Sequence, residues 1–396
     1  EYNLKKSLKG FDKYIEQVMV DWNSPGIAVG IIMKDKLVYA EGFGYRDLEN
    51  KLPVTSKTLF PIASNTKLFT SVAMGMLVEK GDMSWDNPIS NYVPQIKFYN
   101  QDLYNTVTLR DMLSHRTGIS RHDFIWYKSD FTRKELFDRL IYLEPAQSIR
   151  QSSLYNNLMY SAAGYCLELK TGKTWEDYIK SNILNPLSMN SSIFTIEEME
   201  KNQDFAYPYY EDRDTDQLIK RPFYREFSGV GPCGSIISNL ENMSTWVITL
   251  IHNGKFNGEE VIPVAIIKET MQPSIAYPNT TLENEGYDEI LNSVYGMGRS
   301  FSVYKGHLFA SHGGAIGGFY SQVSMMPKDS IGVIVFVNGA HNRPLINTIS
   351  YNIYDRLLDL EQTDFNGRRL KERLENKKVS KEARAKAGSD KIADTK

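Results

Sequence analysis

Hydrophobic side chains recur along the first part of the chain with two different periods. Over residues 11–22 they stand three to four positions apart, which predicts an amphipathic helix. Pro25 and Gly26 end that pattern. Two apolar runs follow at 27–33 and 37–44, separated by a Lys-Asp-Lys turn, and they predict two strands. The chain is therefore expected to open with a helix and then a β-hairpin.

The middle of the chain has mostly helical spacing. Residues 68–81 are rich in Leu, Val, Ala and Met and end in glycine, as expected for a buried helix. Thr108 stands where it can cap a further helix. Residues 133–143 and 158–182 predict more amphipathic helices. We expect residues 86–227 to form an all-helical part of the molecule.

Strand patterns return near the C-terminal end. Residues 296–304 and 307–312 predict one hairpin, 319–326 and 331–337 predict another, and 344–360 predict a last helix. Strands thus come from both ends of the chain, with helices between them. The predicted fold is α+β, with an antiparallel sheet of five or more strands flanked by helices and an all-helical subdomain.

The charge pattern divides the chain near residue 363. Residues 364–396 contain 11 Lys or Arg and 6 Asp or Glu, a net charge of +5, and have no clear apolar stripe. We interpret them as a solvated helix or a charged linker or tail that leaves the domain, which is favoured over a binding segment. The rest is expected to be one domain over residues 1–363. Its α/β part covers about 1–85 and 228–363, and its helical part about 86–227.

Composition narrows the class of protein. The 396 residues are 41% hydrophobic and 24% charged, as in soluble globular proteins. The net charge of −2 gives no electrostatic reason to expect nucleic acid or an anionic membrane as a partner. No apolar stretch reaches transmembrane length, and no signal peptide is visible. The chain begins without Met, so a processed, exported form in the periplasm or outside the cell is expected, with a trimmed fragment as the alternative.

Metal and redox chemistry have no support in the sequence. The two cysteines, Cys166 and Cys233, lack the spacing of a metal or redox motif, and the six histidines form no zinc-type cluster. We expect no metal, no cofactor and no disulfide.

The first candidate for chemistry is Ser64 with Lys67, at the predicted start of the buried helix. On a helix, a hydroxyl and an amine three residues apart share a face. The amine can accept the hydroxyl proton, and the helix dipole favours the developing negative charge. The same Ser-x-x-Lys spacing recurs at Ser302, but in a strand-like run that would point the two side chains to opposite faces. Context therefore favours Ser64 over Ser302 as the candidate. The alternative for Ser64 is an ordinary helix cap.

A second polar cluster is Tyr155-Asn156-Asn157, in a loop before the helix that starts near residue 158. A phenol there could act as a general base if a nearby ammonium lowered its pKa. Asn157 could donate a hydrogen bond to a substrate carbonyl. The same Tyr-x-Asn pattern occurs a second time, starting at Tyr277, so the pattern is weak alone. The alternative of a surface tyrosine beside a helix cap remains open.

A third cluster, His312-Gly313-Gly314-Ala315, follows a strand-like run. Glycine in a strand lets another backbone approach closely, as a substrate pairing with a strand edge requires. A backbone N–H there could point at the substrate carbonyl oxygen. The alternative for His312 is a half-buried histidine with a structural hydrogen bond.

Together and in this order, the three clusters resemble the penicillin-recognising serine hydrolases. These include class C β-lactamases, low-molecular-weight penicillin-binding proteins, D-aminopeptidases and related esterases. Residues 41–47 look like the first hairpin of that family, 112–119 like its helix-to-loop turn, 155–172 like its helix ending in Lys-Thr-Gly, and 231–238 like its glycine turn. The resemblance covers roughly residues 11–358.

The resemblance implies a role for each catalytic residue. Ser64 would be the nucleophile and Lys67 the proton acceptor. Tyr155 would be the general base for acylation and the acid toward the leaving group. The reaction would be acylation of Ser64 followed by hydrolysis with water.

The resemblance also implies how substrate is bound. Asn157 would help to position it, and Gly313 and Gly314 would form the strand edge. The oxyanion hole would come from the backbone N–H groups of the nucleophile and of Ala315. His312 would stand where many members have Lys, which is always cationic at pH 7, whereas His is only sometimes charged near neutrality. This difference resembles some D,D-peptidases and D-aminopeptidases and argues against efficient β-lactam hydrolysis.

Three functions follow as expectations. The first is a penicillin-binding serine hydrolase that cleaves an amide or ester, with a D-amino-acid peptide, a D-Ala-D-Ala-like peptide or a small ester as substrate and β-lactams as ligands. The second is a class C-like β-lactamase. The third is a degenerate scaffold or binding protein. Residues 119–130 and 204–227 are expected to line the cleft. The sequence leaves open the oligomeric state and whether a C-terminal β-barrel, carried by some relatives, is missing.

Overall fold

A nine-stranded antiparallel sheet forms the centre of the computed structural model, which describes residues 4–225, 229–277, 287–339 and 343–393. The strand order is β10-β11-β12-β13-β14-β15-β1-β2-β3. Its strands are β1 (Gly26–Met33), β2 (Lys36–Asp47), β3 (Leu52–Pro53), β10 (Ile275–Ala276), β11 (Ile290–Tyr295), β12 (Ser300–Tyr304), β13 (His307–Ile316), β14 (Phe319–Met326) and β15 (Ile331–Val337).

The two ends of the chain meet in the middle of this sheet. β1 pairs with β15 from Ile27 opposite Val337 to Met33 opposite Ile331. Both strands are almost entirely buried, which explains why they are continuous apolar runs without polar alternation. The predicted α+β class, with an antiparallel sheet built from both chain ends, is confirmed.

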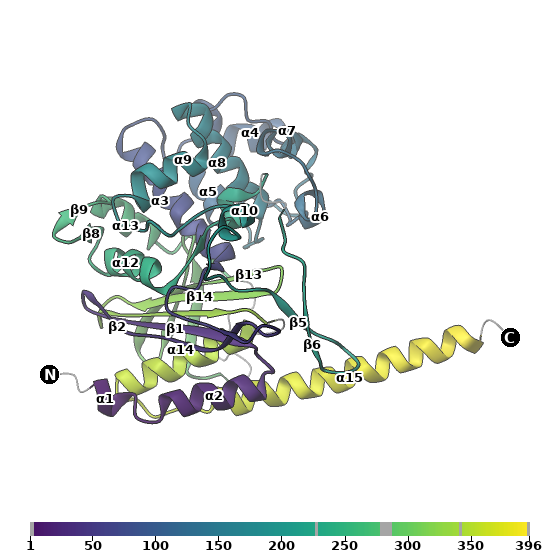
Figure 1. Cartoon of the computed structure of the whole chain (residues 1–396). Coiled ribbons are helices and arrows are strands. Elements are labelled where there is room, and N and C mark those ends of the chain that lie inside the picture. Colours follow the sequence, from purple (N-terminus) through teal and green to yellow (C-terminus); the bar gives the residue numbers. More distant parts are fainter. Residues whose placement is uncertain (1–3, 226–228, 278–286, 340–342, 394–396) are drawn as a thin grey trace.

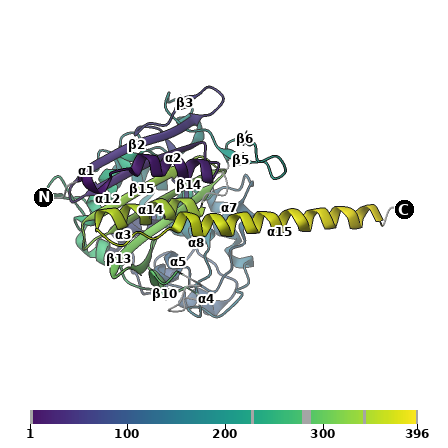
Figure 2. The same ribbon diagram turned by 90° about the horizontal axis from the view of Figure 1, so that it is seen from below.

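Helices cover both faces of the sheet. On one face lie α2 (Phe11–Asp21), α14 (Arg343–Leu357) and the first turns of α15 (Phe365–Ala393), with the short α1 (Leu4–Ser7) beside them (Figure 1 and Figure 2). The other face packs against α12 (Leu240–Ile251). Two separate hydrophobic cores, one on each face, hold these layers to the sheet.

A helical layer lies beyond α12, on the side of the sheet away from α2 and α14 (Figure 1). Its helices are α3 (Thr66–Glu79), α4 (Gln101–Thr106), α5 (Leu109–Leu113), α6 (Asp123–Trp126), α7 (Arg133–Asp138), α8 (Asn157–Thr171), α9 (Trp175–Ile179), α10 (Ile196–Met199), α11 (Gly231–Gly234) and α13 (Val264–Thr270). Single turns η1 (Ala63–Asn65), η2 (Ile89–Asn91), η3 (Arg139–Tyr142) and η4 (Lys180–Leu184) join them.

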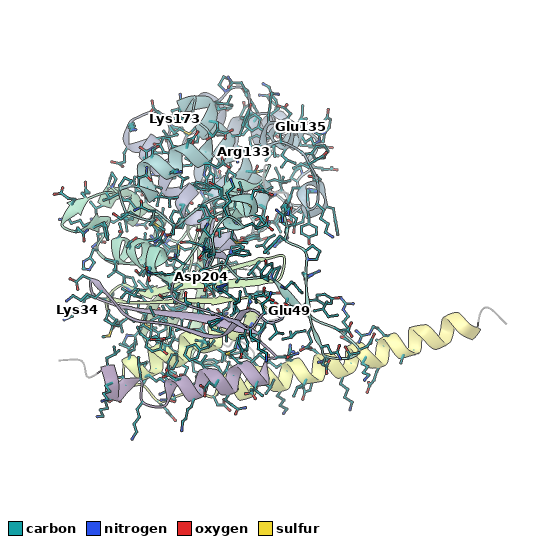
Figure 3. The ribbon with its side chains drawn as sticks, viewed as in Figure 1. Lys34, Glu49, Arg133, Glu135, Lys173 and Asp204 are labelled. Carbon is teal, nitrogen blue, oxygen red and sulfur yellow. The ribbon has the colours of Figure 1, made fainter. Side chains whose placement is uncertain are left out.

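Local signals in the sequence account for several of these boundaries. Thr108 and Asp111 form a capping box at the start of α5, as the position of Thr108 predicted. Gly172 ends α8 with φ +67°, so the predicted helical stretch 158–182 divides into α8, α9 and η4. Arg133 then ties α7 to the following helices through ion pairs with Glu168 and Glu176, and it lies within the helical layer in Figure 3.

Short two-stranded ribbons complete the chain. They pair β4 (Phe60–Pro61) with β7 (Ile237–Ser238), β5 (Tyr209–Glu211) with β6 (Leu218–Lys220), and β8 (Lys255–Phe256) with β9 (Glu259–Glu260). The β5–β6 ribbon lies within residues 86–227, so that part of the chain contains a hairpin as well as helices. The division into domains at residue 363 stays a prediction.

The charged C-terminal segment forms a helix that runs out from the body of the molecule (Figure 1 and Figure 2). Near its start, the Nε1 of Trp22 donates to Asn366 at 2.7 Å. Further along, Glu211 of β5 accepts hydrogen bonds from Arg373 and Lys377, each at 2.8 Å. We call Glu211, Arg373 and Lys377 the ionic clamp. In the described part of the chain, no helix is both long enough and apolar enough to cross a membrane.

Candidate active site

Ser64 lies in the η1 turn that leads directly into α3, with Lys67 in the first turn of that helix. The Nζ atom of Lys67 lies 3.1 Å from the Oγ atom of Ser64. The same amine donates to the carbonyl of Cys233 at 2.9 Å, and its side chain is fully buried. The predicted pairing of hydroxyl and amine is therefore present in the structure. Sequence reasoning did not find the Cys233 carbonyl, because that contact spans 166 residues.

A second set of contacts holds the nucleophile turn against the sheet. The hydroxyl of Ser321 on β14 donates to the carbonyl of Ile62 at 2.7 Å and accepts from the Asn65 amide at 2.8 Å. A Cβ atom on Gly314 would lie 2.3 Å from both the Ile62 carbonyl and the Ser321 hydroxyl. Only glycine therefore fits where β13 passes this turn. A Cβ on Gly313 would meet nothing closer than 3.3 Å.

Two cationic side chains flank the ring of Tyr155. The Nζ atom of Lys67 and the guanidinium carbon of Arg121 each lie 5.0 Å from the ring centroid. The ring of His312 lies 6.3 Å away, centroid to centroid. Cations at this distance favour negative charge on a phenol. The structure thus brings Tyr155 to Lys67 and His312 from distant positions in the sequence.

His115 is a site residue that the motifs did not reveal. Its ring lies 4.2 Å from that of Tyr155 and 4.8 Å from that of Tyr295. Its Nδ1 accepts the backbone N–H of Asn156 at 3.1 Å, so in the neutral ring Nε2 carries the proton. Complete burial, helped by the charge of Lys67, lowers the pKa of His115 well below its usual value. His115 is therefore an uncharged partner for the ring of Tyr155 at neutral pH.

Asn156, between Tyr155 and Asn157, fixes the geometry of this loop. Its side-chain oxygen caps α8 by accepting from the N–H groups of Leu158 at 2.8 Å and Met159 at 3.3 Å. Its amide nitrogen donates to the carbonyls of Ile119 at 3.2 Å and Ser120 at 2.7 Å. One buried side chain thus joins the start of α8 to the loop at 119–130.

Asn157 faces a carboxylate that was not among the predicted site residues. Its amide lies 3.4 Å from Asp123, which also accepts from the Trp126 indole at 3.0 Å and pairs with Arg121 at 2.7 Å. The side-chain oxygen of Asn157 is buried and has no hydrogen-bond partner.

His312 lies at the middle of β13 with both ring nitrogens engaged. Its Nδ1 lies 2.8 Å from the Gly313 carbonyl, which can only accept, so Nδ1 carries a proton. Its Nε2 lies 3.0 Å from the hydroxyl of Tyr295. Burial raises the pKa of Tyr295 well above its usual value, so the phenol keeps its proton. Whether Nε2 of His312 donates or accepts depends on the protonation of the ring, so its charge is not fixed near neutral pH as that of a lysine would be.

An open cleft of about 780 Å³ joins these groups. Six of the eight predicted site residues line it, namely Ser64, Tyr155, Asn157, His312, Gly313 and Ala315. Lys67 lies beneath Ser64, and Gly314 packs behind the nucleophile turn. Ser64 and Ala315, whose backbone N–H groups are the predicted oxyanion hole, therefore border the same cleft. The catalytic roles themselves stay predictions.

The cleft walls come from the two segments expected to line it. Loop 119–130 contributes Arg121, Asp123, Phe124, Trp126 and Tyr127, and the segment after β6 contributes Arg221. The rings of Tyr127 and Tyr224 stack 5.2 Å apart and hold these two segments together. Within the described ranges, no group of three or more His, Cys, Asp or Glu residues could hold a metal ion.

Comparisons with known proteins agree with this geometry. A family model described as beta-lactamase matches residues 11–355. An unguisins hydrolase of Aspergillus violaceofuscus is 24% identical over 371 residues, which are 89% of this chain and 65% of that protein. The protein flp of Staphylococcus aureus is 25% identical over 340 residues, which are 84% of this chain and 63% of that protein. The chain thus spans just under two thirds of the length of these curated relatives.

A solved structure is also similar. It is the octameric penicillin-binding protein homologue from Pyrococcus abyssi, with a TM-score of 0.79 and 27% sequence identity. The match covers 89% of this chain and 78% of that one. The match of the sequence to the beta-lactamase model and the match of the fold to a penicillin-binding protein homologue therefore agree with each other.

Proposed function

Because this chain belongs to the beta-lactamase family, we propose that it is a serine hydrolase that cleaves an amide or ester through an acyl-enzyme formed on Ser64. The observation that carries the proposal is the 3.1 Å contact between the Lys67 amine and the Ser64 hydroxyl at an open cleft. A nucleophile within hydrogen-bond reach of its base is the arrangement that covalent catalysis needs. The names of the Aspergillus relatives, which are hydrolases, support the same reaction class.

The proposed reaction assigns one step to each group. The Ser64 hydroxyl loses its proton to the pair formed by Lys67 and Tyr155, and its oxygen attacks the substrate carbonyl carbon. The carbonyl oxygen then takes up negative charge between the backbone N–H groups of Ser64 and Ala315. Tyr155 returns the proton to the leaving group, and water hydrolyses the acyl-enzyme in a second cycle.

The charges around the cleft favour an anionic substrate. Arg121 and Arg221 contribute two positive charges to its walls, against the single carboxylate of Asp123. Asp123 is already occupied by Arg121, whereas Arg221 has no carboxylate partner among the residues that the structure describes. A substrate carboxylate would thus find the cation of Arg221, whereas a free substrate ammonium would find only Asp123, which Arg121 already pairs. We favour a D-Ala-D-Ala-like peptide over an amide with a free amino group.

Two alternatives are less well supported. A class C-like β-lactamase would use a fixed cation on β13 for the β-lactam carboxylate, whereas this chain has His312 on β13, whose charge is not fixed near neutral pH. Slow turnover of a penicilloyl-enzyme is therefore expected instead of rapid hydrolysis. A degenerate scaffold would have no need for an accessible nucleophile, whereas Ser64 lines the open cleft.

Covalent labelling tests the proposal. We expect a fluorescent penicillin and a fluorophosphonate to label the wild type, with the adduct on the peptide that contains Ser64. Ser64→Ala should lose more than about 90% of the label, in line with the loss of the attacking atom. Ser302→Ala is the matched control, because it removes the other Ser-x-x-Lys serine, and it should label as the wild type does. Equal labelling of Ser64→Ala and wild type would overturn the proposal.

The same preparations can rank substrates. An acylated D-Ala-D-Ala peptide, a D-amino-acid amide, a short-chain ester and nitrocefin should be compared at one pH and salt concentration. We expect the peptide with a free carboxylate to have the highest kcat/KM. The preference should weaken as salt is raised, because screening reduces the attraction to the arginines.

A further inference from the structure

Tyr155 stands in a stretch of chain without regular secondary structure. Residues 151–156 form neither helix nor strand, and α8 begins only at Asn157. The buried backbone groups of such a stretch must find their hydrogen-bond partners elsewhere in the molecule. The direction in which the phenol points therefore depends on the residues that supply those partners.

His115 supplies them on both sides of Tyr155. Its backbone carbonyl accepts the N–H of Leu154 at 2.8 Å, and its Nδ1 accepts the N–H of Asn156 at 3.1 Å. Its ring lies 4.2 Å from that of Tyr155, centroid to centroid. One residue thus contacts three consecutive residues, with the tyrosine in the middle.

The turn that carries His115 is anchored by a buried carboxylate. Asp111 of α5 has no exposed side-chain surface, and it pairs with Arg116 at 2.5 Å and with Arg150 at 2.7 Å. The backbone N–H of Arg150 also donates to the Arg116 carbonyl at 2.7 Å. Arg116 follows His115 directly, and Arg150 lies in the segment that leads to Tyr155. The two segments are therefore joined at several points, which gives His115 a fixed place from which to hold the tyrosine.

Two further features of His115 fit this role. Its φ of +61° lies in the left-handed region, where a residue with a side chain stays only if its surroundings hold it there, and such residues gather at functional sites. Complete burial lowers the pKa of His115 well below its usual value, so Nδ1 remains an acceptor for Asn156 at neutral pH.

We propose that His115 is a positioning residue for Tyr155, and that it holds the phenol where it can return a proton to the leaving group. This role rests on the proposed function, in which the proton of Tyr155 passes to the leaving-group atom as its bond to the acyl carbon breaks. An amide nitrogen must take up that proton in order to leave, whereas p-nitrophenolate leaves without one. A misplaced Tyr155 should therefore slow cleavage of a peptide much more than cleavage of a p-nitrophenyl ester.

The dependence on the leaving group tests this role. The substrates are an acylated D-Ala-D-Ala peptide and the p-nitrophenyl ester of the same acyl group. His115→Gly tolerates the φ of +61° but removes the ring and its acceptor nitrogen. We expect kcat/KM to fall about 30-fold for the peptide and less than about 5-fold for the ester. His115→Asn keeps an acceptor for the Asn156 N–H and should recover most of the peptide rate.

A core variant controls for a loss of stability. Ile183→Val is a small change at a fully buried position of η4 in the helical layer. It removes one buried methylene group and should lower Tm without changing the ratio of the two kcat/KM values. A fall of the same size for peptide and ester in His115→Gly would mark a merely structural role and would overturn the proposal.

A double-mutant cycle asks whether His115 acts through Tyr155. Tyr155→Phe removes the phenolic proton, so in that background His115→Gly should lower kcat/KM for the peptide by less than about 3-fold. The same loss with and without the phenol would overturn the positioning role, even though penicillin still labels Ser64. A wild type in which Ser64 is not labelled would instead overturn the proposed function.

A measurement on the wild type keeps the role open to refutation if His115→Gly fails to fold. Nuclear magnetic resonance of isotope-labelled protein should detect a scalar coupling across the hydrogen bond between the Asn156 amide nitrogen and Nδ1 of His115. We expect this nitrogen to be unprotonated at neutral pH. A protonated Nδ1, or the absence of the coupling, would overturn the proposal.

Discussion

At the scale of single residues, the site depends on which groups carry charge. Lys67 and Arg121 each lie 5.0 Å from the ring centroid of Tyr155, and the buried ring of His115 beside it is uncharged at neutral pH. His312 completes the surroundings of this phenol, 6.3 Å away between ring centroids. In the proposed reaction, the proton that leaves Ser64 therefore passes into a group of two basic side chains, two imidazoles and a phenol.

The burial of His115 makes stability depend on pH. The folded protein keeps this ring neutral, because the pKa of His115 is lowered, whereas the unfolded chain takes up a proton near pH 6.5. The unfolded state therefore binds more protons below that pH, and the free energy of unfolding should fall as pH drops from 7 to 5. The slope due to this residue is at most about 1.4 kcal/mol per pH unit.

Urea unfolding at pH 7, 6 and 5 measures this effect. In His115→Asn the free energy of unfolding should vary less with pH, by the slope that His115 contributes. Asn is chosen because it tolerates the φ of +61° found here and can accept the Asn156 N–H. His252→Asn changes an exposed histidine and should leave the dependence as it is in the wild type. If the free energy of unfolding varied with pH equally in His115→Asn and in the wild type, His115 would not be the source of this dependence.

The motifs of the sequence located Ser64, Lys67, Tyr155 and His312, because three short patterns, each weak alone, follow one another in the order of a known family. They did not locate His115 as a partner of Tyr155, or Asp123 as a partner of Asn157. Those contacts join segments about 35 to 40 residues apart that meet only after folding.

At the scale of elements, the catalytic geometry depends on how closely β13 passes the turn before α3. Ser321 and Asn65 join the two through hydrogen bonds, and Gly314 leaves the space for them. Ala63, directly before Ser64, has φ +47°, a strained value for a residue with a side chain. The turn is thus held by its neighbours in a conformation that it would not favour alone.

Two adjacent glycines on β13 allow a matched comparison. Gly314→Ala would place a methyl group 2.3 Å from the Ile62 carbonyl and force β13 away from the nucleophile turn. We expect kcat/KM to fall by about 100-fold or more, because a displacement near 1 Å at a catalytic site can have that effect. Gly313→Ala meets only the end of the Gln322 side chain at 3.3 Å and should change kcat/KM by less than about 5-fold. Similar losses of kcat/KM in both variants would show that the contact between Gly314 and the nucleophile turn does not set the geometry of the site.

Boundaries of elements followed from the sequence where a local cap or break was present. The capping box at Thr108 and the left-handed Gly172 are of this kind. The β5–β6 ribbon had no such signal, because each strand is only three residues long and is defined by its partner. The helical state of residues 365–393 was open for a similar reason, since a charged segment without an apolar stripe fits a solvated helix and a linker equally well.

At the scale of the whole molecule, the β5–β6 ribbon connects two distant regions. Beyond β6 the chain reaches Arg221 at the cleft, and Glu211 on β5 forms the ionic clamp with α15. Asn23, after α2, also donates to Glu211 at 3.0 Å. The ribbon is thus fixed at its far end by charges on α15 and at its near end by the cleft wall.

Removing the charge of the clamp should loosen α15. Glu211→Gln keeps the shape of the side chain but weakens its charge-assisted hydrogen bonds to Arg373 and Lys377, each about 1–3 kcal/mol before discounting for their partial exposure. We expect faster amide hydrogen exchange over residues 373–380, measured by mass spectrometry, and little change in the labelling of Ser64. Glu375→Gln alters an exposed acid on the same helix and serves as the control. Equal exchange in both variants would exclude the clamp as the restraint on α15.

The length of α15 has a practical consequence. With 29 residues at about 1.5 Å per residue, the helix is a rod of about 40 Å, and it touches the β5–β6 ribbon as far along as Arg384, which donates to the carbonyl of Arg213 at 3.4 Å. The last turns of the helix then run out beyond the ribbon (Figure 2). A dye or a solid support coupled to the far end of this helix would be held away from the sheet, so the molecule could be tethered there with the cleft open to solution.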